Sequence, residues 1–444
     1  VAQTWGEVMF RINSGEMPPK AESQPTADET GNVADWISTR ISEGRATRMA
    51  KRGPVAHYRL SRDEYALAVY DLLGVHFDAR MPGALNEDPR WHGYDRIGSM
   101  LSLSPSHVDR YFAAAEAVLN QAFPMKEPQP TKSRQEATAP ERWLLIPSQK
   151  RGNINVREAG LYRIRVQLSA LPSFKGRIPR LSIWNNSLKR AETGRDVVAA
   201  EDAATTVEIE VFLPQGGFSL INEAPGKFEG HTLSQTPGII TTIKEYRTAR
   251  PTGYKLFDDE GRSIFPLLLI DSLEYEGPIL TDADRKKREG LFPADDGDLA
   301  TARACLQRLM TRAWRRPVTG NEVDRFMRIV VKELAVGEDF RTAYLAAATG
   351  VLTSKNFYYL VEGTPTEPKE RINDWELASR LSFFLWSSLP DESLFAAASA
   401  GELHQPDALR TQLRRMLADS KTDRFTTAFP QQWLQLHKVG MFPP

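Results

Sequence analysis

The sequence predicts a multidomain α+β protein, with mainly helical modules at both ends flanking an antiparallel β-sandwich. Two changes of hydrophobic period support this fold class. Apolar residues recur at helical spacing up to about residue 124, alternate with polar residues over 143–280, and return to helical spacing from about residue 299. The length of 444 residues fits roughly three domains rather than one core.

The first segment, 1–44, is predicted to form two short helices joined by a stiff loop. Apolar residues recur at helical spacing over 5–12, and the double proline at 18–19 cannot continue that helix because proline lacks the amide donor. Thr26 and Glu29 form a capping box that begins the second helix. Two short helices bury too little surface for a core, so we expect their packing partners in upstream sequence or another module.

Residues 45–58 are predicted to be a basic linker, and residues 59–124 a helical domain. Ser61 begins a helix with a box partner three residues later, and Gly74 is placed to end it. A second helix begins at 104–105, where serine stands at the cap and proline in the first turn.

The middle of the chain is predicted to be a β-sandwich over 143–280. Residues 125–142 are rich in Pro, Lys, Thr and Glu, which indicates a linker before it. Apolar and polar residues alternate over 162–168 and 207–213, and the apolar run at 267–270 is typical of a more buried strand. Several half-buried strands separated by turn residues favour an antiparallel sandwich.

Helical spacing returns in two predicted domains, 295–364 and 370–444. Thr319 and Asn373 each begin a helix with a glutamate three residues later. The single cysteine, Cys305, lies on an apolar helical face and cannot form an internal disulfide, so we interpret it as a core residue.

Charge and hydropathy exclude two classes of function. Lys+Arg and Asp+Glu both number 57, which argues against a nucleic-acid-binding protein held by a positive field of the whole chain. No uninterrupted apolar run approaches the roughly 20 residues that a membrane span needs. None of the seven histidines stands three or four residues from another, so no helical zinc motif is visible and we expect no metal site.

Motif runs that occur in a fixed order resemble those of a known protein family. They are RLSRDEY at 59–65 with GYDRIG at 93–98, AWRRPVT at 313–319, and LASRLSFFLWSS at 377–388 with QWL at 432–434. In this order they are similar to the large exported proteins of planctomycetes and relatives, in which several domains of unknown function follow a c-type cytochrome domain. The resemblance implies an extracytoplasmic location, in the periplasm or cell envelope, and haem c in the full-length protein.

Within this resemblance, 1–44 would be the C-terminal part of a truncated cytochrome c-like domain, and Met17 would be an axial ligand of the haem. A thioether is a soft ligand that suits low-spin haem and raises its potential. The sequence contains no Cys-x-x-Cys-His, so we expect no covalently bound haem in this chain. The family commonly continues beyond the QWL run, so we expect truncation at both ends.

The loop around His92 and Asp95 contains the residue types of a polar site. These two side chains could act as an acid/base pair in catalysis. The alternative is a tight turn in which Gly93 supplies backbone freedom and Asp95 accepts hydrogen bonds from nearby amides. The role of the arginines in the motif runs is equally open. Buried arginines that pair with helix ends or carboxylates explain these residues as well as a substrate site does.

Trp184 is the candidate for a ligand-binding residue in the sandwich. It lies on the strand face opposite Leu181 and Ile183, so its indole could be exposed as a platform for a sugar ring. A tryptophan that packs against a neighbouring domain gives the same pattern.

Three functions follow from these observations. The first is an exported, haem-linked multidomain protein that acts in electron transfer or ligand binding at the cell envelope, with a polysaccharide or another envelope protein as its partner. The second is a polysaccharide-degrading hydrolase or lyase, with its site near His92 and Asp95. The third is a non-catalytic envelope scaffold.

Overall fold

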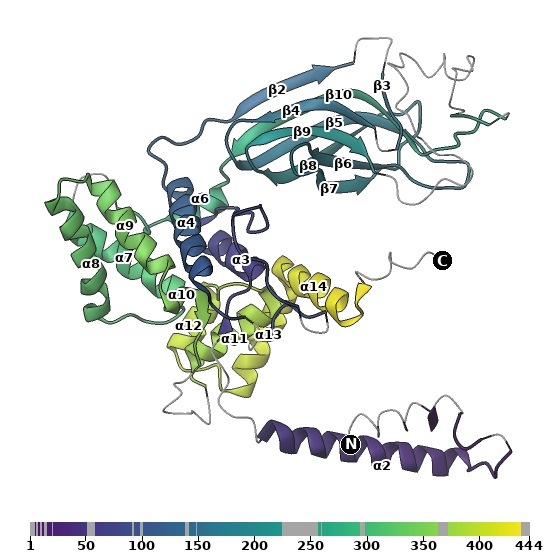
Figure 1. Ribbon diagram of the computed structural model, residues 1–444, viewed down its shortest axis with the longest axis horizontal. Coiled ribbons are helices and arrows are strands. Elements are labelled where there is room, and N and C mark those ends of the chain that lie inside the picture. The colour runs from purple at the N-terminus through teal and green to yellow at the C-terminus, as the bar shows by residue number, and fades with distance from the viewer. Residues whose placement is uncertain are drawn as a thin grey trace.

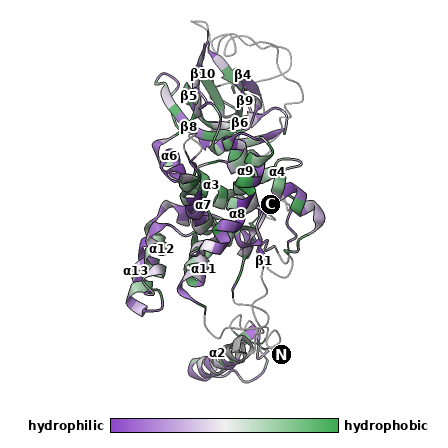
Figure 2. Ribbon diagram, turned by 90° about the vertical axis from the view of Figure 1, so that its left-hand side faces the viewer, coloured by the Kyte–Doolittle hydropathy of each residue, from purple (hydrophilic) through white to green (hydrophobic). Residues whose placement is uncertain are grey.

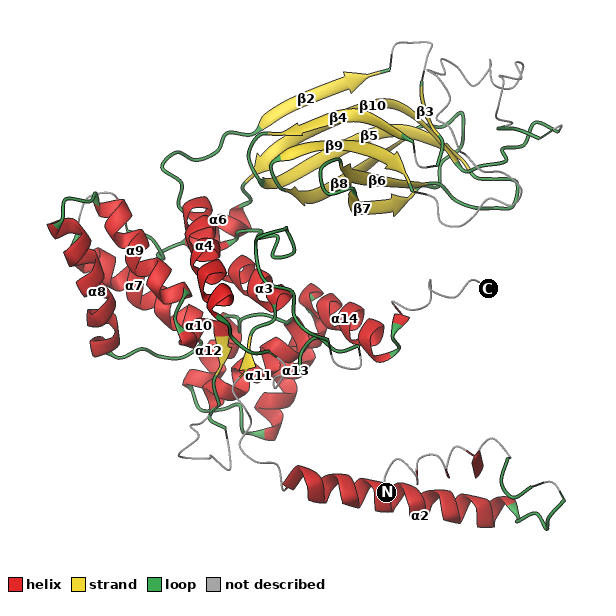
Figure 3. Ribbon diagram, viewed as in Figure 1, coloured by secondary structure: helices red, strands yellow, loops and turns green. Residues whose placement is uncertain are grey.

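The computed structural model confirms the predicted fold class, with helices at both ends of the chain and an antiparallel β-sandwich between them (Figure 1, Figure 3). The structure describes residues 5, 8, 11–12, 16–19, 21–50, 58–90, 93–97, 101–137, 142–147, 149–223, 256–258, 260–293, 298–362 and 372–436. Within these residues, no helix has the length and apolar character that crossing a membrane requires.

The N-terminal helix α2 (Ala27–Ala50) lies apart from the other helices in Figure 1. Its expected capping box is present, because the Thr26 amide donates to Glu29 Oε2 at 2.9 Å and the Glu29 amide donates to Thr26 Oγ1 at 3.3 Å. The helix continues beyond residue 44, into the stretch expected to be a linker. Trp36 on α2 contacts Trp5 edge to face, with ring centroids 5.9 Å apart.

The helices before and after the sandwich share one hydrophobic core. Leu72, Val118, Leu309 and Val351 come from four different helices and lie buried in the same cluster. The two helical domains that the sequence separates therefore form one unit, which we call the helical body. Its elements are α3 (Arg62–Leu73), α4 (Pro105–Ala122), α6 (Asp282–Arg288), α7 (Leu299–Trp314), α8 (Gly320–Ala335), α9 (Phe340–Leu352), α10 (Lys355–Tyr358), and the antiparallel strands β1 (Tyr58–Arg59) and β11 (Tyr359–Leu360).

The expected helix boundaries of the helical body are confirmed. Ser61 caps α3 through a complete capping box with Glu64, and Gly74 ends α3 in the left-handed conformation with φ 64°. Ser104 precedes α4, whose first residue is Pro105.

The C-terminal module has a small core of its own around Trp386. Polar contacts attach it to α3: Ser388 Oγ donates to the Leu67 carbonyl at 3.0 Å, and Asp71 Oδ2 lies 3.0 Å from Arg424 Nη1 and 3.3 Å from Lys421 Nζ. The module is thus docked on the helical body. Its elements are α11 (Asp374–Trp386), α12 (Glu392–Ser399), α13 (Pro406–Ala418), the 3-10 turn η2 (Ser420–Thr422) and α14 (Asp423–Trp433).

The sandwich consists of two antiparallel sheets with a common core. The first has the order β2-β10-β5-β8, with β3 also paired to β10, and the second has the order β4-β9-β6-β7. Figure 2 shows hydrophobic residues concentrated in the sandwich strands and the helical body, whereas α2 is largely hydrophilic. The strands are β2 (Thr131–Glu136), β3 (Trp143–Leu145), β4 (Lys150–Val156), β5 (Gly160–Leu171), β6 (Arg180–Asn185), β7 (Arg190–Asp196), β8 (Thr205–Leu213), β9 (Gly216–Asn222) and β10 (Leu267–Ile279).

Strand β2 lies within the stretch 125–142 that the sequence assigns to a linker. Its residues are polar on both faces and largely exposed, because β2 is an edge strand paired only with β10 among the described residues. A polar edge strand carries no alternation of hydrophobicity, so periodicity could not detect it.

The outer face of the first sheet carries a ladder of ion pairs. Arg163 on β5 lies between Glu210 on β8 and Glu276 on β10, at N–O distances of 2.7 and 3.0 Å. Arg165, two residues further along β5, lies between Glu208 and Glu274 in the same way. A face covered with alternating charges is suited to contact with water.

The sandwich is inserted between α4 and α6 of the helical body. Arg288 on α6 donates to the Ala122 carbonyl at the end of α4, 3.0 Å away, so the two connections to the sandwich lie side by side. Further contacts hold the units together: Arg190 on β7 pairs with Asp78 at 2.5 Å.

Candidate ligand-binding cleft at the junction of the helical modules

A cleft opens where the helical body meets the C-terminal module. Its volume is about 810 Å³. The loop at Arg96, the end of α7 at 314–317, the α10–β11 segment at 356–362 and the first turns of α11 at 373–384 form its walls. The cleft therefore takes residues from four separate segments of the chain.

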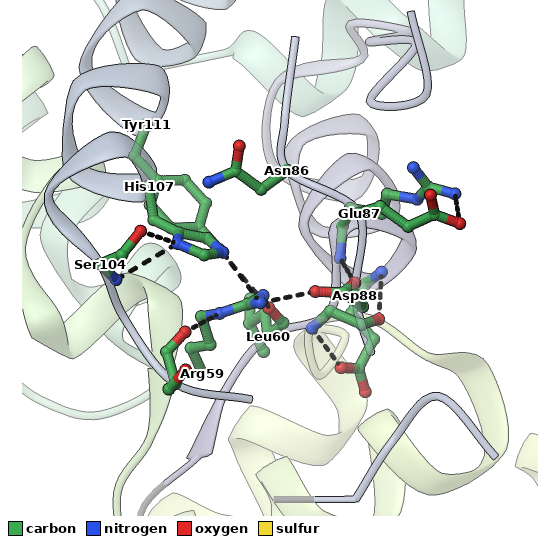
Figure 4. A network of polar contacts seen from close by, with 12 residues as sticks. Arg59, Leu60, Asn86, Glu87, Asp88, Ser104, His107 and Tyr111 are labelled. Carbon is green, nitrogen blue, oxygen red and sulfur yellow. Dashed lines mark hydrogen bonds and ion pairs between the residues drawn. The ribbon is translucent and has the colours of Figure 1, made fainter. Parts of the chain in front are cut away.

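A buried ion pair positions the strand β1 beside this cleft (Figure 4). The side chain of Arg59 is 2% exposed, and its Nη2 lies 2.7 Å from Asp88 Oδ1. Its Nε donates to the Ser102 carbonyl at 2.9 Å, and Nη2 contacts His107 Nε2 at 3.1 Å. Because Arg59 pairs in register with Tyr359, this network fixes the strand that reaches the cleft wall.

The contact between Ser104 and His107 resembles a nucleophile and base, with 2.7 Å between Oγ and Nδ1 (Figure 4). The Ser104 amide also donates to His107 Nδ1, at 3.2 Å, so this ring nitrogen accepts a hydrogen bond within the capping box of α4. Burial, with the Arg59 charge as the next cause, lowers the pKa of His107. Because Ser104 and His107 together cap α4, and Arg59 is held in its buried pair with Asp88, we interpret the network as structural.

Arg315 forms part of the cleft wall and ties helix ends together. It follows α7 in the left-handed conformation with φ 59°, and it is 4% exposed. Its two Nη groups donate to the carbonyls of Ala313, Phe357, Asn356 and Tyr359 at 2.8–3.0 Å. Carbonyls at a helix end have no partner within the helix, so this arginine stabilises the ends of both α7 and α10.

Arg96 links the cleft to α3 through Glu64. Its Nη2 lies 2.5 Å from Glu64 Oε1 and donates to the Phe383 carbonyl at 2.7 Å. Burial raises the pKa of Glu64, while the Arg96 charge opposes that change. The side chain of Glu64 is 1% exposed and that of Arg96 is 30% exposed, so the arginine, and not the carboxylate, faces the cleft.

Two further arginines line the cleft, each paired with a glutamate. Arg316 contacts Glu322 through Nη2 and Nη1 at 2.7 and 3.2 Å, and it lowers the pKa of that carboxyl group to about 2. Arg380 on α11 contacts both carboxylate oxygens of Glu362, with Nε 2.9 Å from Oε1. Bidentate pairs of this kind hold a guanidinium in a fixed orientation.

Aromatic side chains complete the walls. Tyr359 and Trp375 are partly exposed, and Phe384 is 54% exposed. A concave site with apolar ring faces and a few oriented polar groups is typical of a small-molecule site.

Of the predicted catalytic pair, His92 lies outside the described residues. Asp95 lies next to Arg96, where Gln432 Nε2 donates to Asp95 Oδ1 at 2.9 Å and the Asp95 amide donates to Gln432 Oε1 at 3.4 Å. This contact joins the GYDRIG run to the QWL run. A catalytic role of His92 and Asp95 stays a prediction.

Trp184 lies on the outer side of β6 and is partly buried. The ammonium group of Lys150 lies 4.6 Å from its ring centroid, and its Nε1 has no acceptor among the described residues. The lysine covers one ring face, so a sugar could stack there only after the lysine moved.

Met17 is 44% exposed in the loop before α2, so its sulfur is accessible to a ligand. Met17 would be the residue of this chain that holds a haem, and the sequence contains no Cys-x-x-Cys-His. In the described part of the chain, no group of three or more His, Cys, Asp or Glu side chains is arranged to hold a metal ion.

Three protein-family models match the chain, and each is described as a protein of unknown function. DUF1587 matches residues 58–124, DUF1595 matches 301–362 and DUF1592 matches 372–444. The chain thus carries three domains of unknown function, in the segments that contain the motif runs. A comparison with curated proteins gave no match.

Several solved structures are similar to about a third of the chain, a length comparable to that of the sandwich. A carbohydrate-binding module of Cellvibrio mixtus lichenase 5A, in complex with cellotriose, has 10% identity and a TM-score of 0.18, and covers 34% of this chain and 89% of its own. The C-terminal module of the laminarinase LamC from Zobellia galactanivorans has 12% identity and a TM-score of 0.18, with 33% and 100% covered. A structure of infectious bursal disease virus has 9% identity and a TM-score of 0.19, with 35% and 34% covered. Likenesses at these TM-scores say nothing about what this chain binds.

The cleft was not predicted from the sequence, although all four of its arginines stand in the motif runs. Arg96, Arg316 and Arg380 each occur in a different run. Their partners Glu64 and Glu322 were predicted only as capping residues, and Glu362 gave no signal, because the contacts with the arginines depend on tertiary packing. The juxtaposition of arginines with ring side chains in all three runs was the available hint.

Proposed function

We propose that this chain is the saccharide-binding part of an exported, haem-linked protein, and that the junction cleft holds the saccharide. The carrying observation is the composition of the cleft wall, in which ring faces of Tyr359, Trp375 and Phe384 stand beside guanidinium groups held in place by ion pairs. Ring faces pack against the C–H face of a sugar, and planar polar groups bind its hydroxyls. A volume of about 810 Å³ lies within the usual range for ligand sites.

Binding is favoured over hydrolysis because the carboxylates near the cleft are already engaged. Glu362 is paired with Arg380, and Glu376 accepts a hydrogen bond from the Asn373 amide at 2.7 Å. Glycoside hydrolysis commonly needs two carboxyl groups that reach the scissile bond from opposite sides. The cleft therefore supports recognition of a saccharide better than its cleavage.

The test is calorimetric titration of the purified chain with a panel of oligosaccharides. Replacing Phe384 by Ala is expected to weaken binding about tenfold, because the ring contributes apolar contact area. Phe384 is 54% exposed, so its loss should not unfold the protein. The matched control is Phe174→Ala, an exposed phenylalanine on the sandwich, which should leave the affinity unchanged. Equal loss in both variants, or no saccharide binding at all, would reject the proposal.

The haem part of the proposal rests on Met17. A haem bound in a longer protein would supply electron transfer, and this chain would contribute the thioether at one axial position. The exposure of the side chain supports this role. Absorption spectroscopy of a longer, matured protein that includes a Cys-x-x-Cys-His segment tests it. Met17→Ala should change the spectrum of the low-spin reduced haem, and an unchanged spectrum would remove Met17 as a ligand.

A further inference from the structure

We propose that the saccharide bound in the cleft is acidic, with its carboxylate or sulfate group contacting Arg316 at the cleft edge. This inference rests on the proposed function and specifies the class of ligand. It starts from charge, because four arginines and two glutamates line the cleft. One guanidinium comes from 58–124, two from 301–362 and one from 372–444, so each family segment contributes to the wall, and at least three of the four are paired with a glutamate.

The position of each arginine decides which of them can reach a ligand. Arg315 is 4% exposed and its Nη groups donate to helix-end carbonyls. It therefore contributes charge to the cleft but no direct contact to a ligand. The side chains of Arg96, Arg316 and Arg380 are 30%, 38% and 49% exposed. These three can face a ligand in the cleft.

Arg316 has the geometry of a prepared anion site. Its pair with Glu322 uses Nη1 and Nη2, and Nη1 also donates to the Pro317 carbonyl at 3.0 Å. The guanidinium lies over the Trp314 ring, 5.4 Å from the centroid. Among the described residues no acceptor contacts its Nε, so this donor is left for a ligand oxygen. Because the pair and the ring already fix the side chain, an anion would bind with little loss of conformational entropy.

The ring walls explain why the anion should be part of a saccharide. A free inorganic anion would use the guanidinium groups but not Tyr359 or Phe384. An acidic sugar satisfies both parts of the wall at once, since its ring packs on the aromatic faces while its charged group reaches the arginine.

The experiment compares charged and neutral forms of one saccharide. Trigalacturonate and its fully methyl-esterified form have the same rings, and only the first carries charge. Calorimetry on the intact chain should give at least about tenfold tighter binding of the acid at low salt, and the difference should shrink as salt screens the charges. A sulfated galactan trisaccharide, run in parallel, shows whether sulfate can replace carboxylate, and tight binding of either acid supports the inference.

The variant Arg316→Gln should weaken binding of the acid about tenfold and weaken binding of the ester much less. Arg303→Gln is the matched control. Arg303 lies on α7, its side chain is 39% exposed and it pairs with Asp324, but it does not line the cleft. It should therefore leave binding unchanged.

The outcomes separate the two proposals. Equal affinities for acid and ester, without salt dependence, would overturn the acidic specificity and leave saccharide binding intact. Failure of the acid, the ester and the sulfated trisaccharide, together with the neutral oligosaccharide panel, would overturn both. If Arg303→Gln and Arg316→Gln weakened binding equally, the assignment to Arg316 would be wrong.

Discussion

The buried ion pair between Arg59 and Asp88 is expected to be a major determinant of the stability of the helical body. Both side chains are nearly inaccessible, at 2% and 5% exposed, with 2.7 Å between Nη2 and Oδ1. Asp88 Oδ2 also accepts a hydrogen bond at 2.6 Å from the amide of Arg62, the first residue of α3. The carboxylate therefore neutralises a buried guanidinium and satisfies a helix N-terminus at the same time.

Replacing Asp88 by Ala should destabilise the helical body by about 3–5 kcal/mol, the usual cost of leaving one member of a buried pair uncompensated. Arg59→Met should cost a similar amount, because it leaves the carboxylate buried. The double variant should cost less than the two single costs added together, by about 2 kcal/mol or more, since it leaves neither charge alone. The hydrogen bonds of Arg59 to backbone carbonyls do not depend on Asp88 and do not change this coupling.

Urea unfolding followed by far-UV circular dichroism measures this prediction, because the helices dominate the signal. With a slope of about 1–3 kcal/mol per molar urea, Asp88→Ala should lower the midpoint by about 1 M or more. The matched control is Glu210→Ala, which removes an exposed carboxylate also 2.7 Å from its arginine, Arg163. That change should cost about 0–1 kcal/mol. Equal costs for Asp88→Ala and Glu210→Ala would refute the argument from burial.

Three further predictions concern single features of the helical body. The pKa of Glu322 is lowered from 4.5 to about 2, mainly by its hydrogen bond to Arg316. The contribution of this carboxylate to stability is therefore complete above about pH 4.5 and is lost as the pH falls towards 2. In Glu322→Gln, the urea midpoint should decline less than in the unchanged protein over this range. Gly74→Ala should cost at least about 1–2 kcal/mol in urea unfolding, because φ is 64° and the new methyl group would lie 2.8 Å from Cβ of Asp284; an unchanged midpoint would contradict this. Replacing 125–280 by a short flexible linker should leave a helical protein that melts cooperatively, since α4 and α6 already meet, and loss of the cooperative transition would show that the sandwich is needed for folding.

Local signals in the sequence were sufficient for both ends of α3, although not for the end of α2. The Ser61 box and the left-handed Gly74 depend on residues within one turn of each other, so the sequence alone identified them. Arg315 is a buried arginine that donates to helix-end carbonyls, as one of the two interpretations expected, whereas Arg380 pairs with Glu362 but is 49% exposed. Strand β2 was missed because its polar residues give no hydrophobic period.

The cleft could not be predicted, because its contacts join distant segments. Asp95 and Gln432 are 337 positions apart, and Arg96 donates to Phe383 across 287 positions. Periodicity and capping describe neighbours along the chain and contain no information about such pairs. Only the occurrence of the motif runs in one chain indicated that they belong together.

The boundaries of the three family models do not coincide with separate cores. Residues from 58–124 and 301–362 pack in the same hydrophobic cluster, and Phe383 of the 372–444 segment belongs to that cluster as well. The cleft has the same dependence, because each segment supplies at least one of its arginines. A ligand that contacted all three segments would bind only when they are assembled. Such a ligand at a hundred times its dissociation constant should stabilise the assembled state by about 2.7 kcal/mol. Docking of the C-terminal module and binding in the cleft would then be thermodynamically coupled.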